Sequence, residues 1–269
     1  TMIKYGEENI MAQKPSFSIK DDGTDIDREN NSGEKGPSAL ILAEEPADGK
    51  SASLFSRMGP GVYKKLKDIG IELQVPAGDT VFIQGEQHDG IFLIETGVVR
   101  TFYVGPNGRE ITLAHWSRGH FVGGPEIFGG GHHIWSGIAA DDCKLLKLGG
   151  DAFRSLVEKS NILAVCLLEG SIQKGKCYSA LLQMLGTRSV VERLAQLLLI
   201  LSKSEGSAEV DNPIISRVLT HEELASMVGA TRQWVTVTLD KFRKAGAIRI
   251  VGRNIQITNV DFLITKTGI

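Results

Sequence analysis

The hydrophobic period of this chain changes once, near residue 150, and that change limits the folds open to it. Between about residues 76 and 148, short apolar runs such as "GIFLIETGVVRTFYV" and "EITLAHW" alternate with turns rich in Gly, Pro, Asn and Asp. This pattern is typical of an antiparallel barrel or sandwich. From Asp151 onward the apolar spacing is helical. The sequence therefore predicts an α+β fold in which an N-terminal antiparallel barrel or sandwich is followed by helices.

Length and composition set further bounds. With 269 residues the chain is long enough for about two domains of ordinary size. The formal charge of −2 means that any nucleic-acid partner needs a local basic surface. The three cysteines stand far apart, which argues against a disulfide scaffold, a four-cysteine zinc site and a four-cysteine iron–sulfur cluster. The longest apolar run, "LAQLLLILS", is shorter than the ~20 residues that cross a bilayer, so we expect a cytoplasmic protein without a membrane segment.

Residues 1–50 differ from the rest of the chain. They carry six Lys and Arg residues against eleven Asp and Glu residues, and they show neither helical nor strand periodicity. Such a composition cannot bury much apolar surface. We expect an acidic, disordered tail, and the sequence assigns no role to it.

A long helix is predicted over residues 161–186. Along it, apolar and small residues recur at alternating spacings of four and three, which is typical of a helix that packs on another helix. The predicted seam consists of Leu163, Leu167, Gly170, Lys174, Cys177, Leu181 and Met184. We expect a parallel homodimer held by this seam. The alternative is a helix that lies on its own barrel, and Gly170 and Lys174 fit the seam imperfectly.

The last part of the chain, residues 187–269, begins with the helix "SVVERLAQLLLILSKS" and ends in a helix-turn-helix pattern. Thr220 followed by Glu223 is a capping box, which starts a helix. Gly229 supplies the left-handed residue that ends it, and Thr231 then caps a second helix. Two short helices joined by a tight glycine turn are a helix-turn-helix.

The first turns of that second helix are the candidate DNA-binding surface. In a DNA-binding helix-turn-helix these turns meet base edges, where Arg suits guanine and Gln suits adenine. The following "AIRIVGRNIQIT" predicts a two-stranded wing, whose turn can present Arg253 to phosphate. The candidate residues are Thr231, Arg232, Gln233, Trp234, Thr236 and Arg253. From Pro213 onward eight basic residues oppose four acidic ones, a net charge of +4. The alternative is a winged-helix module that binds protein and has a solvated basic face.

The order of these parts resembles the CRP/FNR family of bacterial transcription regulators. The resemblance covers about residues 51–259 and is carried by "GEQHDGIFLIETGVVR", the long helix, "VVERLAQLLLILSK" and the winged helix-turn-helix. It implies an antiparallel β-roll, or jelly roll, of the cyclic-nucleotide-binding type at residues 51–160. It also implies a homodimer that places two recognition helices on a palindromic site in double-stranded DNA and recruits or blocks RNA polymerase.

The sequence departs from the members of this family that bind cyclic AMP. Those members carry Gly-Glu-x-x and then Arg-Ser around the phosphate, whereas here Gly124 stands at the glutamate position and Ile134-Trp135 at the Arg-Ser position. A cyclic phosphate would lose its bidentate arginine, so we do not expect cyclic AMP as the ligand. In the DNA-reading helix, Gln233 replaces the common glutamate and Val237 a common arginine. The operator should therefore differ from the usual family consensus.

The resemblance places an effector pocket between the roll and the long helix. The residues that these surfaces offer are Val122, Gly123, Gly124, Pro125, Glu126, Trp135, Ser136, Tyr178, Ser179 and Leu182. Apolar walls with a few polar groups suit a small organic molecule that is aromatic or of mixed polarity. The alternative for Trp135 and Tyr178 is ordinary core packing. We expect neither a cofactor nor a metal, and the sequence leaves the identity of the effector open.

Two other functions remain alternatives at this point. His115, His120, His132 and His133, together with Cys143, could in principle ligate haem or zinc in a gas or redox sensor. A cupin-like metalloenzyme is the second alternative, but "HHIW" lacks the His-x-His spacing that such a site needs. A sensor that signals to a protein partner is disfavoured by the Arg232-Gln233 face. Target genes, and whether binding activates or represses them, are not readable from the sequence.

Overall fold

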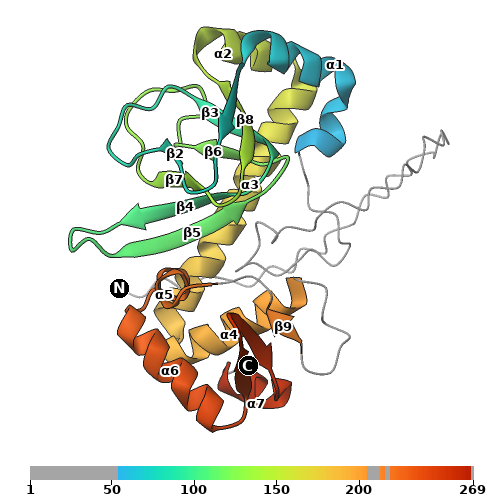
Figure 1. Ribbon diagram of the computed structural model, residues 1–269. Helices are drawn as coiled ribbons and strands as arrows, with labels where there is room; N and C mark the ends of the chain where they lie inside the picture. Colours follow the sequence, from blue (N-terminus) through green and yellow to red (C-terminus); the bar gives the residue numbers. More distant parts are fainter. Residues whose placement is uncertain (1–53, 205–212, 216–218, 268–269) are drawn as a thin grey trace, which may run out of the picture. The chain divides into compact units, whose positions relative to one another are not determined.

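The computed structural model describes residues 54–204, 213–215 and 219–267 (Figure 1). The predicted acidic tail, residues 1–50, lies outside this part of the chain. Among the described helices, none is both long and apolar enough to span a membrane.

The roll consists of two four-stranded antiparallel sheets. One has the order β1 (Ile71–Val75), β8 (Cys143–Leu148), β3 (Ile91–Thr96) and β6 (Phe121–Gly123), and the other has the order β2 (Thr80–Phe82), β7 (Ser136–Ala139), β4 (Val99–Val104) and β5 (Glu110–Trp116). Both sheets contribute to one apolar core, with Phe82, Val99 and Trp116 from one sheet and Phe92 and Leu145 from the other. A hairpin with Asn107 and Gly108 in its turn joins β4 to β5.

The roll has a helix before its first strand, which was not predicted, and one after its last strand, where helical spacing is expected from Asp151 onward. Helix α1 (Leu54–Ile69) includes Gly59, with a φ of 60°, and Pro60, and these two residues interrupt the helical pattern of its sequence. Helix α2 (Gly150–Glu158) follows β8 directly. Met58 of α1 and Phe153 of α2 are buried in a second core cluster, which also contains Leu146 of β8. The helix that precedes the strands and the helix that follows them in the chain therefore pack into one cluster.

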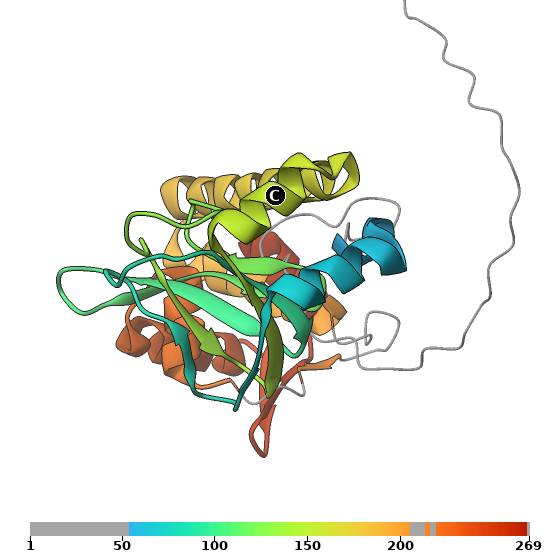
Figure 2. The ribbon, with the colours of Figure 1, turned by 90° about the horizontal axis from the view of Figure 1, so that it is seen from above.

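Helix α3 (Asn161–Thr187) lies where the long helix is predicted, but the face predicted to pair with a second subunit packs on the roll. Leu163 and Leu167 are buried in the cluster of Met58 and Phe153, and Cys177 is buried in the core between the two sheets. Figure 2, viewed from above, shows the yellow helix α3 running beside the green strands. The predicted dimer seam is therefore wrong.

The whole predicted seam lies on the face of α3 that its own chain covers. Its residues are Leu163, Leu167, Gly170, Lys174, Cys177, Leu181 and Met184. Gly170 shows how close the approach is, because a Cβ built there would lie 2.7 Å from the ring of Phe121. A four-three spacing indicates that one face of a helix is buried and does not indicate what buries it. The alternative of a helix lying on its own barrel is the one that the structure supports.

In the part of the C-terminal domain that the structure describes, four helices combine with a three-stranded sheet. The helices are α4 (Val190–Ser204), α5 (His221–Val228), α6 (Arg232–Lys244) and α7 (Val260–Lys266), and the sheet has the order β10 (Ile248–Val251), β11 (Asn254–Ile257) and β9 (Ile214–Ile215). One core joins them, with Leu198 of α4, Leu224 of α5, Val235 of α6, Ile257 of β11 and Leu263 of α7 all buried.

The local signals for the helix-turn-helix are confirmed. The Thr220 Oγ1 accepts from the Glu223 backbone N–H at 3.1 Å, and the Glu223 carboxylate accepts from the Thr220 backbone N–H at 2.7 Å. Gly229 ends α5 in the left-handed conformation, and the Thr231 side chain accepts from the Trp234 backbone N–H. Strands β10 and β11 form the expected wing, with Gly252 and Arg253 in its turn. The α+β fold with roll, long helix and winged helix-turn-helix is thus confirmed.

The capping box gives a first prediction. Replacing Thr220 with Ala removes the side-chain acceptor at the start of α5 and should lower the free energy of unfolding of the C-terminal domain by about 1 kcal/mol. Replacing it with Ser keeps a hydroxyl acceptor and should cost much less. Urea unfolding followed by circular dichroism measures both variants, and equal stability of the Ala and Ser variants would contradict the role of the cap.

Candidate functional site

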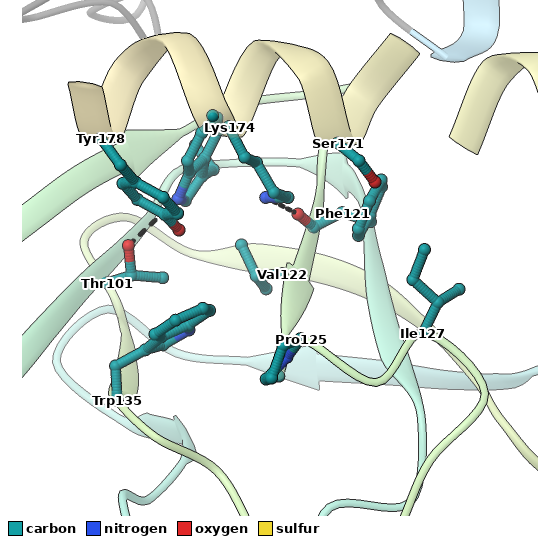
Figure 3. Close-up of a pocket in the computed structure, with 13 residues that line it drawn as sticks. Thr101, Phe121, Val122, Pro125, Ile127, Trp135, Ser171, Lys174 and Tyr178 are labelled. Atoms are coloured by element: carbon teal, nitrogen blue, oxygen red, sulfur yellow. Dashed lines mark hydrogen bonds between the residues drawn. The ribbon is translucent and has the colours of Figure 1, made fainter. Parts of the chain in front are cut away.

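A cavity of about 270 Å³ lies between the roll and α3 (Figure 3). Strands β4, β5 and β6, the loop that follows β6, and the residues just before β7 line one side, and α3 lines the other. Its wall is mainly apolar, with two tryptophans, one tyrosine and one phenylalanine among the lining side chains. The lining residues are Thr101, Trp116, Phe121, Val122, Gly123, Gly124, Pro125, Ile127, Trp135, Ser171, Lys174, Gly175 and Tyr178. This volume and this wall suit a compact organic molecule.

Six of the ten predicted effector residues line this cavity: Val122, Gly123, Gly124, Pro125, Trp135 and Tyr178. The other four do not. The hydroxyl oxygen of Ser136 accepts a hydrogen bond from the Gln84 backbone N–H at 2.9 Å, and Glu126, Ser179 and Leu182 are exposed. Leu182 is 71% exposed in this chain, so its side chain faces away from the roll.

Lys174, which the sequence analysis assigned to the dimer seam, lines the cavity. Its Nζ donates to the Phe121 backbone oxygen at 2.5 Å and lies 3.7 Å from the centre of the Trp116 ring. Figure 3 shows the side chain reaching from α3 toward the strand that carries Phe121. Burial lowers the pKa of Lys174 to about 7. A lysine in an otherwise apolar heptad is the signal that could have pointed to this role.

The titratable groups around Lys174 carry no negative charge. Burial, together with the positive charge of Lys174, lowers the pKa of His120 to about 4, so its imidazole is neutral at pH 7. Burial raises the pKa of the Cys177 thiol to about 11, and burial raises the pKa of Tyr178 above its usual range. Thiol and phenol are therefore also neutral at pH 7. Among the described residues, no carboxylate forms an ion pair with Lys174.

Gly124 is held in place by a buried histidine that the sequence analysis missed. The Gly124 backbone N–H donates to the His88 Nε2 at 2.6 Å, and His88 stacks on His133 with 4.5 Å between ring centres. A Cβ on Gly124 would lie 1.7 Å from the imidazole of His88. The position where cyclic-AMP-binding relatives carry glutamate therefore has no room for any side chain unless His88 moves.

The other predicted histidines pack into the roll separately. His133 stacks between His88 and Phe82, His120 packs beside Trp116, and His115 is buried on β5. His132 is exposed. Within the described residues, no three His, Cys, Asp or Glu side chains gather in a way that would hold a metal ion.

The predicted DNA-reading residues lie on the outward side of α6. Arg232, Gln233, Trp234 and Thr236 are exposed, whereas Val235 is fully buried. Thr236 Oγ1 donates to the Arg232 backbone oxygen at 2.9 Å and lies 2.8 Å from the Nδ1 of His221. Its hydroxyl is thus engaged within the protein, as is that of the capping residue Thr231. Arg232, Gln233 and Trp234 remain as side chains directed outward.

The basic residues of this domain fall into two groups. Arg243 and Lys244 both pair with Asp240 at 2.7 Å, near the C-terminal end of α6. Arg232 at the start of α6 and Arg253 in the wing are exposed and make no ion pair with any described residue. Unpaired guanidinium groups at these two places are available to an anionic partner such as a phosphate backbone.

Comparison with known proteins agrees with this geometry. The family model described as cyclic nucleotide-binding domain matches residues 72–160, which include the roll. The model described as Crp-like helix-turn-helix domain matches residues 192–265.

Among characterised relatives, a CRP-like cAMP-activated global transcriptional regulator from Mycobacterium tuberculosis is 28% identical over 215 residues, which cover 80% of this chain and 96% of the relative. A global nitrogen regulator from Synechococcus elongatus is 26% identical over 209 residues, which cover 77% of this chain and 92% of the relative. The crystal structure of a CRP/FNR-family transcriptional regulator from Thermus thermophilus is 26% identical, has a TM-score of 0.57, and matches 74% of this chain and 99% of its own.

These relatives are regulators of transcription and not enzymes, which removes the cupin-like enzyme as an alternative. The match extends over both domains and over almost the whole length of the relatives, in the same order of parts. The chain belongs to the CRP/FNR family of transcription regulators, with an effector domain of the cyclic-nucleotide-binding type and a DNA-binding helix-turn-helix domain.

Proposed function

We propose that this protein reads a specific, palindromic DNA sequence as a homodimer and that a small organic effector bound between the roll and α3 controls its affinity for that sequence. The observation that carries the DNA-reading part is the capped start of α6, where Arg232 and Gln233 are exposed and Arg232 has no ion-pair partner among the described residues. Arg253 in the wing supplies a second contact, to phosphate. On DNA, RNA polymerase is the further partner that the family implies.

We propose that the effector is not cyclic AMP, although one of the relatives is named as cAMP-activated. Gly124 has no space for the glutamate of the usual pocket, and Trp135 lines the cavity where an arginine-serine pair would be needed. Among the described lining residues there is no arginine, so a cyclic phosphate would lack its bidentate partner. A mainly apolar cavity of about 270 Å³ supports a compact ligand with an apolar body.

We place the dimer contact on the face of α3 opposite to the roll. There, five large apolar side chains are exposed at helical spacing: Ile162, Val165, Leu168, Ile172 and Leu182. Solvated apolar side chains in such a row favour burial against another apolar surface. The same row on a second copy, related by a two-fold axis, is self-complementary.

The dimer contact gives a second prediction. Replacing Ile172, which is 50% exposed, with Glu puts a charge into the middle of this row and should convert dimers to monomers with weakened binding to a palindromic site. The matched control is Ile83→Glu, the same change at a residue that is 46% exposed in the roll. Sedimentation equilibrium measures the mass of each variant. A dimeric Ile172→Glu variant would place the contact elsewhere.

The DNA interface gives a third prediction, because loss of a base-reading residue and loss of a phosphate-binding residue should change DNA binding in different ways. Arg232→Ala should cost about 1–3 kcal/mol per half-site and relax the preference at one base pair. Arg253→Ala should weaken specific and random DNA alike and reduce the salt dependence of binding by about one contact per half-site.

Binding to a randomised operator library at two salt concentrations separates these outcomes. Lys65→Ala, which removes an exposed positive charge from α1, controls for the change in net charge. An unaltered sequence preference in Arg232→Ala would show that another residue reads the bases.

A further inference from the structure

We propose that the effector is an organic monoacid with a single-ring apolar body, and that its anionic group pairs with the Lys174 ammonium. This inference rests on the proposed function and deepens it by naming the chemistry of the ligand. It is built on three observations: the cavity beside Lys174, the lack of an anion near that side chain, and the hydrogen bonds that Trp116 and Ser171 already make within the protein.

A buried ammonium without a partner of opposite charge is costly. The Nζ of Lys174 has one backbone oxygen, that of Phe121, and the faces of the Trp116 and Phe121 rings, at 3.7 and 4.6 Å from their centres. These contacts stabilise a cation only partially. An anionic ligand would supply the missing charge.

Three of the other polar side chains of the cavity wall, those of Thr101, Trp116 and Ser171, are already hydrogen-bonded. Trp116 Nε1 donates to Thr101 Oγ1 at 3.0 Å, and Ser171 Oγ donates to the Leu167 backbone oxygen at 2.9 Å. The Tyr178 ring meets the Trp116 ring edge to face at 6.4 Å between centres, and its neutral hydroxyl makes no hydrogen bond to any described residue. Lys174 is therefore the one cation among the described residues that line the cavity.

A single cation in a small apolar cavity favours one negative charge rather than two. The groups that face Lys174 from the neighbouring elements are the imidazole of His120 and, from α3 itself, Cys177 and Tyr178, and all three are neutral at pH 7. None of them can add a second positive charge near neutral pH. A carboxylate on a ring of about benzene size matches both the charge and the apolar wall.

Protonation makes the pairing measurable. Burial holds the pKa of Lys174 near 7 in the free protein, so at pH 8 most of the side chain is neutral. Binding of a carboxylate favours the ammonium and raises this pKa. An acid that binds at pH 8 should therefore take up close to one proton per site, whereas a neutral amide of the same shape should take up none. Above about pH 7, the affinity for the acid should fall as the pH rises.

The test uses the full-length protein without DNA. Benzoate, phenylacetate and 3-phenylpropionate, and the amide of each, are titrated by calorimetry at pH 6.5 and, in buffers of different ionisation enthalpy, at pH 8. We expect at least one acid to bind about tenfold more tightly than its amide at pH 6.5. Its binding at pH 8 should be accompanied by uptake of about one proton.

Two variants test whether Lys174 causes the preference for the acid and the proton uptake. Lys174→Met should remove the preference for the acid and the proton uptake while it leaves the affinity for the amide within about twofold. Lys176→Met, which removes an exposed lysine two residues further along α3, should change neither. Because Lys174→Met removes an unpaired buried charge, its melting temperature should equal or exceed that of the unmodified protein. A marked loss of stability would instead identify Lys174 as a structural residue.

The inference is overturned if acids and amides bind equally, if none of the six compounds binds, or if the preference for the acid survives in Lys174→Met. These results leave the DNA-binding proposal intact, because that proposal is measured on operator DNA. Conversely, an acid that binds through Lys174 but does not change the affinity for the operator would contradict effector control and support the ligand chemistry.

Discussion

The packing of α3 on the roll is the contact on which the other features of this structure depend. Leu163 and Leu167 are buried against the residues of α1 and α2, and Cys177 is buried between the two sheets. Once this face of the helix is fixed, Lys174 must enter the interior, and the row that contains Ile172 must face solvent. The packing of one face of α3 on the roll thus forms the wall of the effector cavity, and it leaves exposed the opposite face, on which we place the second subunit.

The two proposed sites use positive charge in opposite ways. Arg232 and Arg253 are exposed. Water hydrates their guanidinium groups, so the free-energy cost of having no ion-pair partner is small in the absence of DNA. Lys174 has lost that hydration, so its pKa falls to about 7 and the ammonium is held by a carbonyl oxygen and aromatic faces alone. The exposed charges provide affinity for a polyanion in general, whereas the buried charge can select one small ligand by charge and shape.

The features that were predictable from the sequence are those whose physical cause is local. The capping box of Thr220 and Glu223, the left-handed Gly229 and the wing turn at Gly252 each depend on a few consecutive residues, and each is found where it is expected. The alternation of the strands likewise predicts the roll. Helix α1 was missed because Gly59 and Pro60 break its pattern, although the flanking residues are helical.

The features that were not predictable depend on contacts between distant segments. The spacing along α3 predicts a buried face, but only the folded chain shows that the roll, rather than a second subunit, covers Leu163 and Cys177. For the same reason the direction of Lys174 was not predictable. His88 was missed because its partner, Gly124, lies 36 residues further along the chain.

The contact between Gly124 and His88 also limits how this pocket can change through mutation. A Cβ at position 124 would lie 1.7 Å from the imidazole, and His88 is itself stacked on His133, which is stacked on Phe82. Introducing a glutamate at position 124 therefore requires His88 to move or to be replaced by a smaller residue, and either change disturbs the stack with His133. Because positions 88 and 124 are in contact, the effects of substitutions at the two positions should not be additive.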